Sequence, residues 1–342
     1  MGERFFASDN SAPVHPAVMQ AIEDANDGHA ISYGDDRWTR SATKALQKRL
    51  GRTSSVHFVY NGTGANVLGI QSAIAGYHGI ICTDVSHIHT DECGAPERYM
   101  GAKLLAVPTT DGRMQAEQVL RELHALGVEH HSQPRVVSLT QSTELGTVYP
   151  PELVREIAKV CHKRDLLLHM DGARISNASV SLDRDLAAIT GKLGVDILSL
   201  GGTKNGMMFG EAVVFFRPEL ADAFKYIRKQ GMQLASKMRY IAAQFEALFG
   251  GDLWWELASH ANGMAMLLAR ELSAISSVEI VYPVEANAVF ARLPEQAITR
   301  AQKDVFFYVW NEAERVVRLM CSYDTTEDDV RRLVAAIATA LD

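Results

Sequence analysis

The chain has 342 residues, of which 47% are apolar and 22% charged, the balance of an ordinary globular protein. Its net charge is −7 and its basic residues form no stripe, which argues against nucleic acid or an anionic membrane as a partner. No apolar run is long enough to span a bilayer, and the first residues lack a signal-peptide pattern. The four cysteines are scattered and form no CxxC pair, so we expect a protein of the reducing cytoplasm.

Seven short apolar runs alternate with helical patterns along the first two thirds of the chain. Most of these runs are apolar throughout, which is typical of strands buried on both faces of a mainly parallel sheet. We therefore predict an α/β fold whose large domain has three layers, α/β/α, around a mainly parallel seven-stranded sheet. The predicted strands are 56–60, 79–83, 104–107, 135–140, 166–170, 196–200 and 212–216.

The pattern changes near residue 220. A helical stretch up to about residue 273, which includes 233–249 and 257–272, precedes four short strand patterns and a last helix over 327–341. This order indicates a small C-terminal α+β domain, and we expect the large domain to cover 1–240 and the small one 241–342. The predicted strands of the small domain are 278–282, 288–293, 306–310 and 316–321.

A glycine-rich turn follows the first predicted strand. In open α/β sheets, ligands bind where strands end and helices begin. The segment 61–66, Asn-Gly-Thr-Gly-Ala-Asn, would leave backbone N–H groups free at a helix start, so Gly62 and Thr63 could cradle a phosphate. A tight strand-to-helix turn explains the same residues equally well. The segment is neither a Walker loop nor GxGxxG, which argues against a nucleotide-binding protein.

Two further strand ends carry chemically useful side chains. Asp171 follows the fifth predicted strand, and Lys204 lies among glycines after the sixth. A strand-end Asp can pair with a pyridine nitrogen, and a desolvated lysine amine can act as a nucleophile. Alone, Asp171 could equally cap a helix and Lys204 could be an exposed loop residue. The phosphate cradle, Asp171 and Lys204 follow one another in the order that a Schiff-base cofactor site uses. Together they predict pyridoxal 5'-phosphate bound through Lys204.

His87 and Arg318 are further candidates. The His87 ring could stack on a cofactor or be a structural histidine. With His89 and Asp91 it could also bind a metal, as in a metal-dependent hydrolase, although zinc sites usually use other spacings. Arg318 lies in an apolar strand and needs an anion, either a substrate carboxylate or a structural ion pair.

The ordered motifs resemble the low-specificity L-threonine aldolases and their phenylserine-aldolase relatives, which belong to the aspartate-aminotransferase-like fold type I of pyridoxal-phosphate enzymes. The resemblance covers nearly the whole chain. It is carried by SDN, YGDD, NGTGAN, HIHTDECGAPE, HMDGARISNA, GGTKNG, GEAVVFF, QLASKMR, HAN, PVEAN and RLMCSYDT.

The resemblance implies a role for each matching position. Ser8 and Arg318 would clamp the substrate carboxylate, and Tyr33 would come from the neighbouring subunit of a homodimer or homotetramer. The implied cofactor contacts are Lys204 at the aldehyde carbon, Asp171 at the pyridine nitrogen, Arg174 near the ring hydroxyl, Gly62 and Thr63 at the phosphate, and His87 stacked on the ring.

The chain departs from the family in the loop after the fourth strand, where Glu144 occupies the position of a histidine in many threonine aldolases. The preferred substrate side chain and stereochemistry therefore stay open. Asn10 and Ala12 replace threonines that hold a cation in some relatives, so we expect no metal site.

The resemblance implies a carbon–carbon lyase that cleaves L-threonine, L-allo-threonine or phenylserine to glycine and an aldehyde. His87, acting directly or through water, is the first choice for the base on the 3-hydroxyl, and Glu144 is the second. A β-eliminating lyase or an aminotransferase of the same fold is the alternative within this cofactor class.

Overall fold

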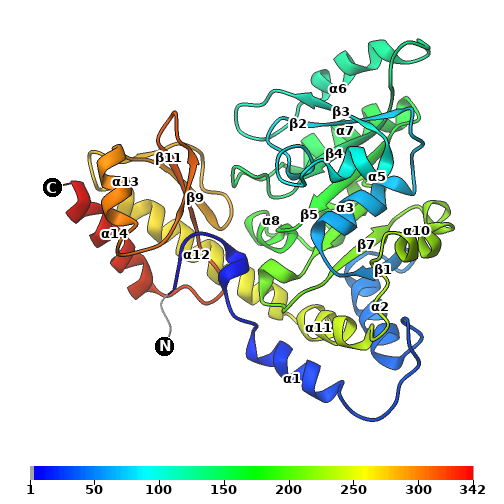
Figure 1. The fold of residues 1–342 in the computed structure, drawn as a ribbon, viewed down its shortest axis with the longest axis horizontal. Helices are drawn as coiled ribbons and strands as arrows, with labels where there is room; N and C mark the ends of the chain where they lie inside the picture. Colours follow the sequence, from blue (N-terminus) through cyan, green and yellow to red (C-terminus); the bar gives the residue numbers. More distant parts are fainter. Residues whose placement is uncertain (1–3, 342) are drawn as a thin grey trace.

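The structure is a computed structural model that describes residues 4–341. Seven strands form the larger sheet in the order β1-β7-β6-β5-β4-β2-β3 (Figure 1). Strand β7 runs antiparallel to β1 and β6, and the remaining pairs are parallel. The strands are β1 Ser55–Val59, β2 His78–Thr83, β3 Lys103–Val107, β4 Gln133–Thr140, β5 Leu167–Gly172, β6 Ile197–Gly201 and β7 Glu211–Phe215. The predicted mainly parallel seven-stranded sheet is confirmed.

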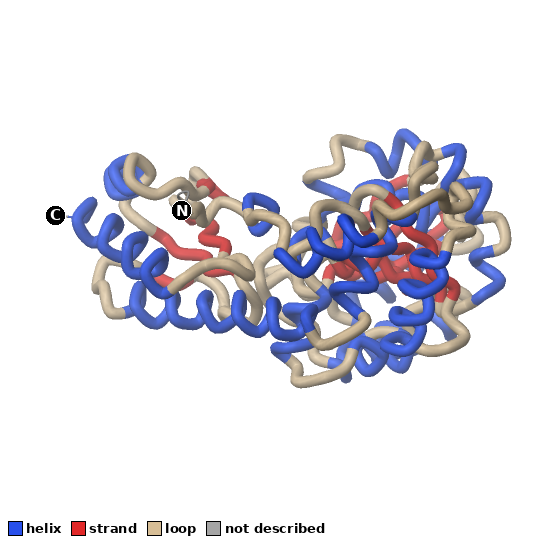
Figure 2. The backbone as a smooth tube through the Cα atoms, turned by 90° about the horizontal axis from the view of Figure 1, so that it is seen from below, coloured by secondary structure: helices blue, strands red, loops and turns tan. Residues whose placement is uncertain are grey.

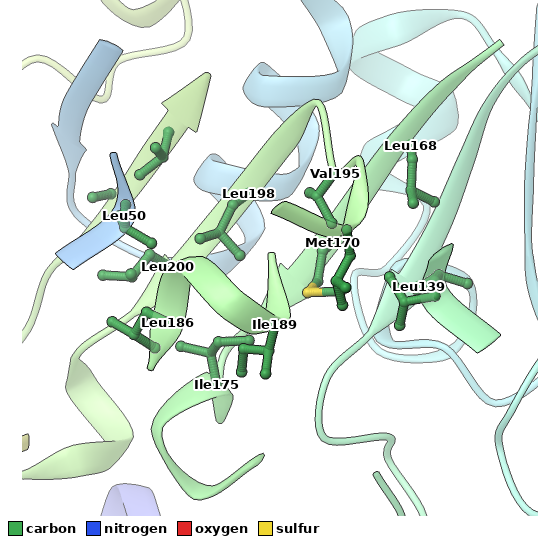
Figure 3. Packing of buried hydrophobic residues seen from close by; sticks show 14 of the residues in the cluster. Leu50, Leu139, Leu168, Met170, Ile175, Leu186, Ile189, Val195, Leu198 and Leu200 are labelled. Carbon is green, nitrogen blue, oxygen red and sulfur yellow. The ribbon is translucent and has the colours of Figure 1, made fainter. Parts of the chain in front are cut away.

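Helices cover both faces of this sheet because its central strands are apolar on both sides. Leu168 and Leu198 pack on one face against Ile175, Leu186 and Ile189 (Figure 3). Their neighbours Leu167 and Ile197 point to the other face, into a core that includes part of α3. The helices of the chain up to this sheet's last strand are α1 Pro16–Asp24, α2 Arg37–Leu50, α3 Gly62–Gln71, α4 His87–Thr90, α5 Ala95–Met100, α6 Ala116–Glu122, α7 Pro151–Lys163, α8 Ile175–Ser181 and α9 Leu186–Ile189.

A second, antiparallel sheet of four strands has the order β10-β11-β9-β8. Figure 2 shows its strands as a group separate from those of the larger sheet, with helices along one side. Its strands are β8 Glu279–Ile280, β9 Ala288–Arg292, β10 Tyr308–Asn311 and β11 Val316–Met320. The helices after β7 are α10 Phe224–Gln230, α11 Arg239–Phe249, α12 Leu253–Ser273, α13 Glu295–Ala301 and α14 Glu327–Leu341.

The N-terminal segment packs on the smaller sheet. The Phe6 side chain is buried in the core of that sheet. The Phe6 N–H donates to Phe306 O at 2.9 Å, and Met320 N–H donates to Phe6 O at 2.8 Å. Residue 6 therefore belongs structurally with residues that follow it by about three hundred positions in the chain. The division at residues 240 and 241 stays a prediction.

Three elements differ from the sequence-based prediction. The predicted helix 233–249 begins only at Arg239, because residues 233–235 have no regular structure and residues 236–238 form a turn. Strand β8 is two residues long instead of five. Helix α13 was missed because its seven residues show little periodicity. Among the described residues, no helix is long and apolar enough to cross a membrane.

Candidate active site

The carboxyl ends of β1, β4, β5 and β6 and the amino end of β7 meet at one edge of the larger sheet. This geometry follows from the antiparallel direction of β7. A cavity of about 280 Å³ opens there. Six of the predicted site residues line it: Gly62, Thr63, His87, Glu144, Asp171 and Lys204.

The start of α3 forms one wall of the cavity. Asn61 caps the helix, with its Oδ1 accepting from Gly64 N–H at 2.8 Å. The first backbone hydrogen bond of the helix runs from Ala65 N–H to Asn61 O. The N–H groups of Gly62 and Thr63 come before it and have no acceptor within the helix. Free N–H groups and the helix dipole favour an anion at this point. The wall is therefore suited to a phosphate.

Asp171 is the penultimate residue of β5, within the strand and not after it as predicted. The residue is 5% exposed. Oδ1 accepts from Ala173 N–H at 3.0 Å, and Oδ2 accepts from Asn66 Nδ2 at 2.8 Å. These bonds fix the carboxylate in the lining of the cavity, where it can pair with a cationic ring nitrogen.

His87 begins the short helix α4, and its ring lies half-buried at the cavity. Nδ1 lies 2.9 Å from Glu92 Oε1. The hydrogen bond to Glu92 raises the pKa of His87, burial opposes this, and the charges of Glu144 and Asp171 raise it further. The ring therefore gains protons more readily than a free histidine.

Glu144 lies in the buried loop between β4 and α7. The loop is held by a bond from Thr143 N–H to Thr147 O and by a contact of 2.7 Å between their hydroxyls. Glu144 Oε2 lies 4.0 Å from Arg174 Nη1. A carboxylate thus stands in the cavity wall where many threonine aldolases have an imidazole.

Lys204 lies in a single 3-10 turn, Thr203–Asn205, after β6. Its amine makes no hydrogen bond or ion pair with another residue in the range 4–341. Glu211, the first residue of β7, lines the same cavity, and its Oε2 accepts from Gly202 N–H at 3.1 Å. Burial raises the pKa of Glu211 to about 7, although Thr203 and the charge of Lys204 act to lower it.

Ser8, Arg174 and Arg318 lie beside the cavity and not in its lining. Ser8 Oγ accepts from Asn10 N–H, and Asn10 lines the cavity. Arg174 is buried and bound by Asp9. Arg318 donates to Ala7 O at 3.4 Å and covers the Trp310 ring, but its buried Nε has no partner. Burial, followed by the charge of Arg174, lowers the pKa of Arg318.

Tyr33 lies away from Lys204 within this chain. It is 51% exposed and borders a separate hollow with Arg228 and Lys44. His89 and Asp91 are also exposed and do not line the cavity with His87. In the described part of the chain, no three His, Cys, Asp or Glu side chains are arranged to hold a metal ion.

Sequence reasoning gave no role to four residues that shape the site. Asp9, Asn66 and Glu92 lie within quoted motifs, but their contacts join segments far apart in the chain. Glu211 is the first residue of β7, and in a parallel sheet the start of a strand lies away from the ligand. The direction of β7, which no local pattern encodes, brings Glu211 to the cavity.

The fold and the strand-edge site define an α/β enzyme of the aspartate-aminotransferase-like type, as predicted. A family model described as beta-eliminating lyase matches residues 6–296. The chain belongs to this beta-eliminating lyase family, in its threonine aldolase group.

Two relatives named low specificity L-threonine aldolase match almost end to end. The one from Pseudomonas sp. is 41% identical over 98% of this chain and 97% of its own length. The one from Pseudomonas aeruginosa is 42% identical over 97% of this chain and 96% of its own. The solved structure of Leishmania major threonine aldolase matches with a TM-score of 0.93 at 29% identity, over 98% of this chain and 99% of that one.

Proposed function

We propose that this enzyme cleaves L-threonine, L-allo-threonine and related L-3-hydroxy-amino acids, such as phenylserine, to glycine and an aldehyde, with pyridoxal 5'-phosphate as cofactor. The observation that carries the proposal is the single cavity in which Lys204, Asp171, His87 and the start of α3 meet. The relatives named L-threonine aldolase support the reaction class. All these substrates share the amino-acid group and the 3-hydroxyl. The preference for one substrate side chain is therefore set by the cavity wall near Glu144.

The residues of the cavity fit the cofactor. The amine of Lys204 would hold it covalently, and the carboxylate of Asp171 would bind its protonated ring nitrogen. The N–H groups of Gly62 and Thr63, with the Thr63 hydroxyl, would bind its phosphate. When bound, pyridoxal phosphate supplies an electron sink for the pair released as the Cα–Cβ bond breaks.

Arg318 and Ser8 would bind the substrate carboxylate. Arg318 has a buried Nε without a partner, and no acidic residue in the described chain forms an ion pair with it. A guanidinium in this state is suited to a carboxylate brought by the substrate. Arg174 cannot serve equally, since Asp9 already holds two of its nitrogens. Fixing the carboxylate orients the substrate, and this orients the Cα–Cβ bond for cleavage.

His87 would take the proton from the 3-hydroxyl, either directly or through water. Its ring is at the cavity, and its Nδ1 is bound by Glu92, which leaves Nε2 for the substrate. Glu144 is the second candidate for this base. We also propose a homodimer or homotetramer in which Tyr33 of one subunit reaches the cavity of the next, because Tyr33 is exposed and does not line its own cavity.

Product analysis tests the reaction. Purified protein should release glycine and the matching aldehyde from L-threonine, L-allo-threonine and L-phenylserine. Release of a keto acid and ammonia would instead make it a β-eliminating lyase, and amino transfer to a keto acid would make it an aminotransferase. Borohydride reduction followed by peptide mass spectrometry should find the cofactor mass on Lys204, and Lys204→Ala should lose both the label and turnover.

A further inference from the structure

A chain of hydrogen bonds joins the two sides of the cavity. His87 Nδ1 lies 2.9 Å from Glu92 Oε1, and the same oxygen accepts from Asn66 Nδ2 at 3.0 Å. Asn66 Nδ2 uses its second hydrogen to donate to Asp171 Oδ2 at 2.8 Å. The amide orientation follows from its neighbours, because an amide oxygen could not face two carboxylates without repulsion.

Glu92 has a fully buried carboxyl group. Its side chain is 0% exposed, and its Oε2 has no hydrogen-bond partner. Burying an isolated carboxylate is costly unless a cation and hydrogen-bond donors accompany it. His87 Nδ1 and Asn66 Nδ2 are the two nitrogens within hydrogen-bond reach of Glu92 Oε1. Asp171, which lines the cavity, accepts the other N–H of the Asn66 amide. One amide group therefore donates to both carboxyl groups.

We propose that Glu92 is a positioning residue that fixes the His87 tautomer, with the proton on Nδ1 and Nε2 facing the cavity, while Asn66 ties Glu92 and Asp171 into one unit. In this arrangement Glu92 Oε1 accepts from both Asn66 Nδ2–H and His87 Nδ1–H, so Nδ1 carries the proton. Nε2 is then bare in the neutral ring and can accept a proton. This inference deepens the proposed function, since it states how His87 becomes competent as a base.

The charge environment of His87 supports this arrangement. Carboxylates approach the ring from three elements: Glu92 from the turn between α4 and α5, Glu144 from the loop after β4, and Asp171 from β5. The hydrogen bond to Glu92 contributes most to the raised pKa of His87, ahead of the opposing effect of burial. Removing Glu92 should therefore affect His87 more than removing any exposed carboxylate nearby.

The test measures His87 directly and needs no turnover. Full-length protein without added cofactor is treated with diethyl pyrocarbonate, which acylates unprotonated imidazole nitrogen, over a range of pH. Mass spectrometry then gives the acylation rate at His87, with the exposed His89 in the same peptide as an internal reference. In Glu92→Gln the midpoint of the His87 rate–pH curve should move to lower pH. Glu97→Gln, which removes an exposed charge from α5, is the matched control and should leave the midpoint unchanged.

An unchanged His87 midpoint in a folded Glu92→Gln variant would overturn the proposal. If that variant does not fold, the wild-type protein still decides the question. Nitrogen-15 spectra of histidine-labelled protein, with His87 assigned by a His87→Asn variant, should show the neutral ring protonated on Nδ1. The opposite tautomer would exclude Glu92 as the positioning residue. Neither measurement depends on glycine release, so failure of the proposed reaction would be seen separately.

Discussion

Asp9 and Arg174 form a buried, two-pronged ion pair between segments 165 residues apart in the chain. Arg174 Nε donates to Asp9 Oδ2 at 2.7 Å, and Nη2 donates to Oδ1 at 2.9 Å. Asn287, which precedes β9, donates to the same Oδ2 at 3.1 Å. Burial raises the pKa of Asp9, but the charge and hydrogen bonds of Arg174 outweigh it, so the pKa is lowered overall. The pair joins the N-terminal segment to both sheets.

Asp9→Ala should destabilise the protein by roughly 3–5 kcal/mol, because it leaves the Arg174 charge buried without its partner. Urea unfolding followed by circular dichroism measures this loss. Asp304→Ala, at an exposed aspartate, is the control and should change the free energy of unfolding by less than about 0.5 kcal/mol. Equal effects of the two substitutions would show that the pair contributes nothing.

Glu211→Gln should change how stability depends on pH. The pKa of Glu211 is raised from 4.5 to about 7 in the folded chain, so the folded state binds more protons than the unfolded state between these values. Stability should therefore fall as pH rises from 4.5 to about 7, by roughly 3 kcal/mol for this group. Glutamine has no charge to bury, so the variant should lose this part of the slope. If the free energies of unfolding of both proteins changed equally with pH between 5 and 8, the raised pKa of Glu211 would be contradicted.

Gly201→Ala should disturb both packing and activity. A Cβ at Gly201 would lie 2.5 Å from Ala173 O and 2.7 Å from Ala173 Cα, which are backbone atoms that cannot move aside easily. Overpacking of this kind typically costs about 1–3 kcal/mol. The shift would also separate Lys204 from Asp171, so turnover should drop. Gly251→Ala, where no atom lies within 4 Å, should be nearly neutral in a thermal-melt comparison.

Arg318→Ala should raise the KM for the amino acid roughly ten- to hundred-fold, the loss expected for hydrogen bonds to a charged group. Arg292 on the neighbouring strand β9 offers a control, because Glu279 and Glu314 pair with it at the surface. Steady-state kinetics of Arg292→Ala should match the wild-type enzyme. A wild-type KM in Arg318→Ala would remove this residue from the carboxylate clamp.

His87→Asn should lower kcat by roughly 10²- to 10⁴-fold if His87 is the base on the 3-hydroxyl. Glu144→Gln should cause a smaller loss that differs between L-threonine and L-phenylserine, because Glu144 lines the cavity wall. Single-turnover rates for both variants and both substrates separate the two roles. A larger loss in Glu144→Gln than in His87→Asn would assign the proton transfer to Glu144.

The positions of several site residues follow from local sequence alone. Continuous apolar runs and the residues that follow them correctly placed Gly62, Thr63 and Lys204 at one cavity, because parallel strands bring their carboxyl ends to one edge. The site roles of these residues stay predictions. The contact of Arg174 with Asp9 could not be predicted from the sequence, because it depends on how the N-terminal segment returns across the fold. Pairings of this kind are set by tertiary packing and leave no periodic trace.

Helix α12 has 21 residues and takes part in both cores. Trp254 and Leu257, near its start, are buried with the larger sheet, whereas Leu268 and Leu272, near its end, are buried with the smaller one. A helix of this length is a rod of about 30 Å, and Figure 1 shows it running between the two sheets. Unfolding of either core would expose the apolar residues that α12 buries there. The two halves of the molecule are therefore expected to lose their structure cooperatively, as one calorimetric transition.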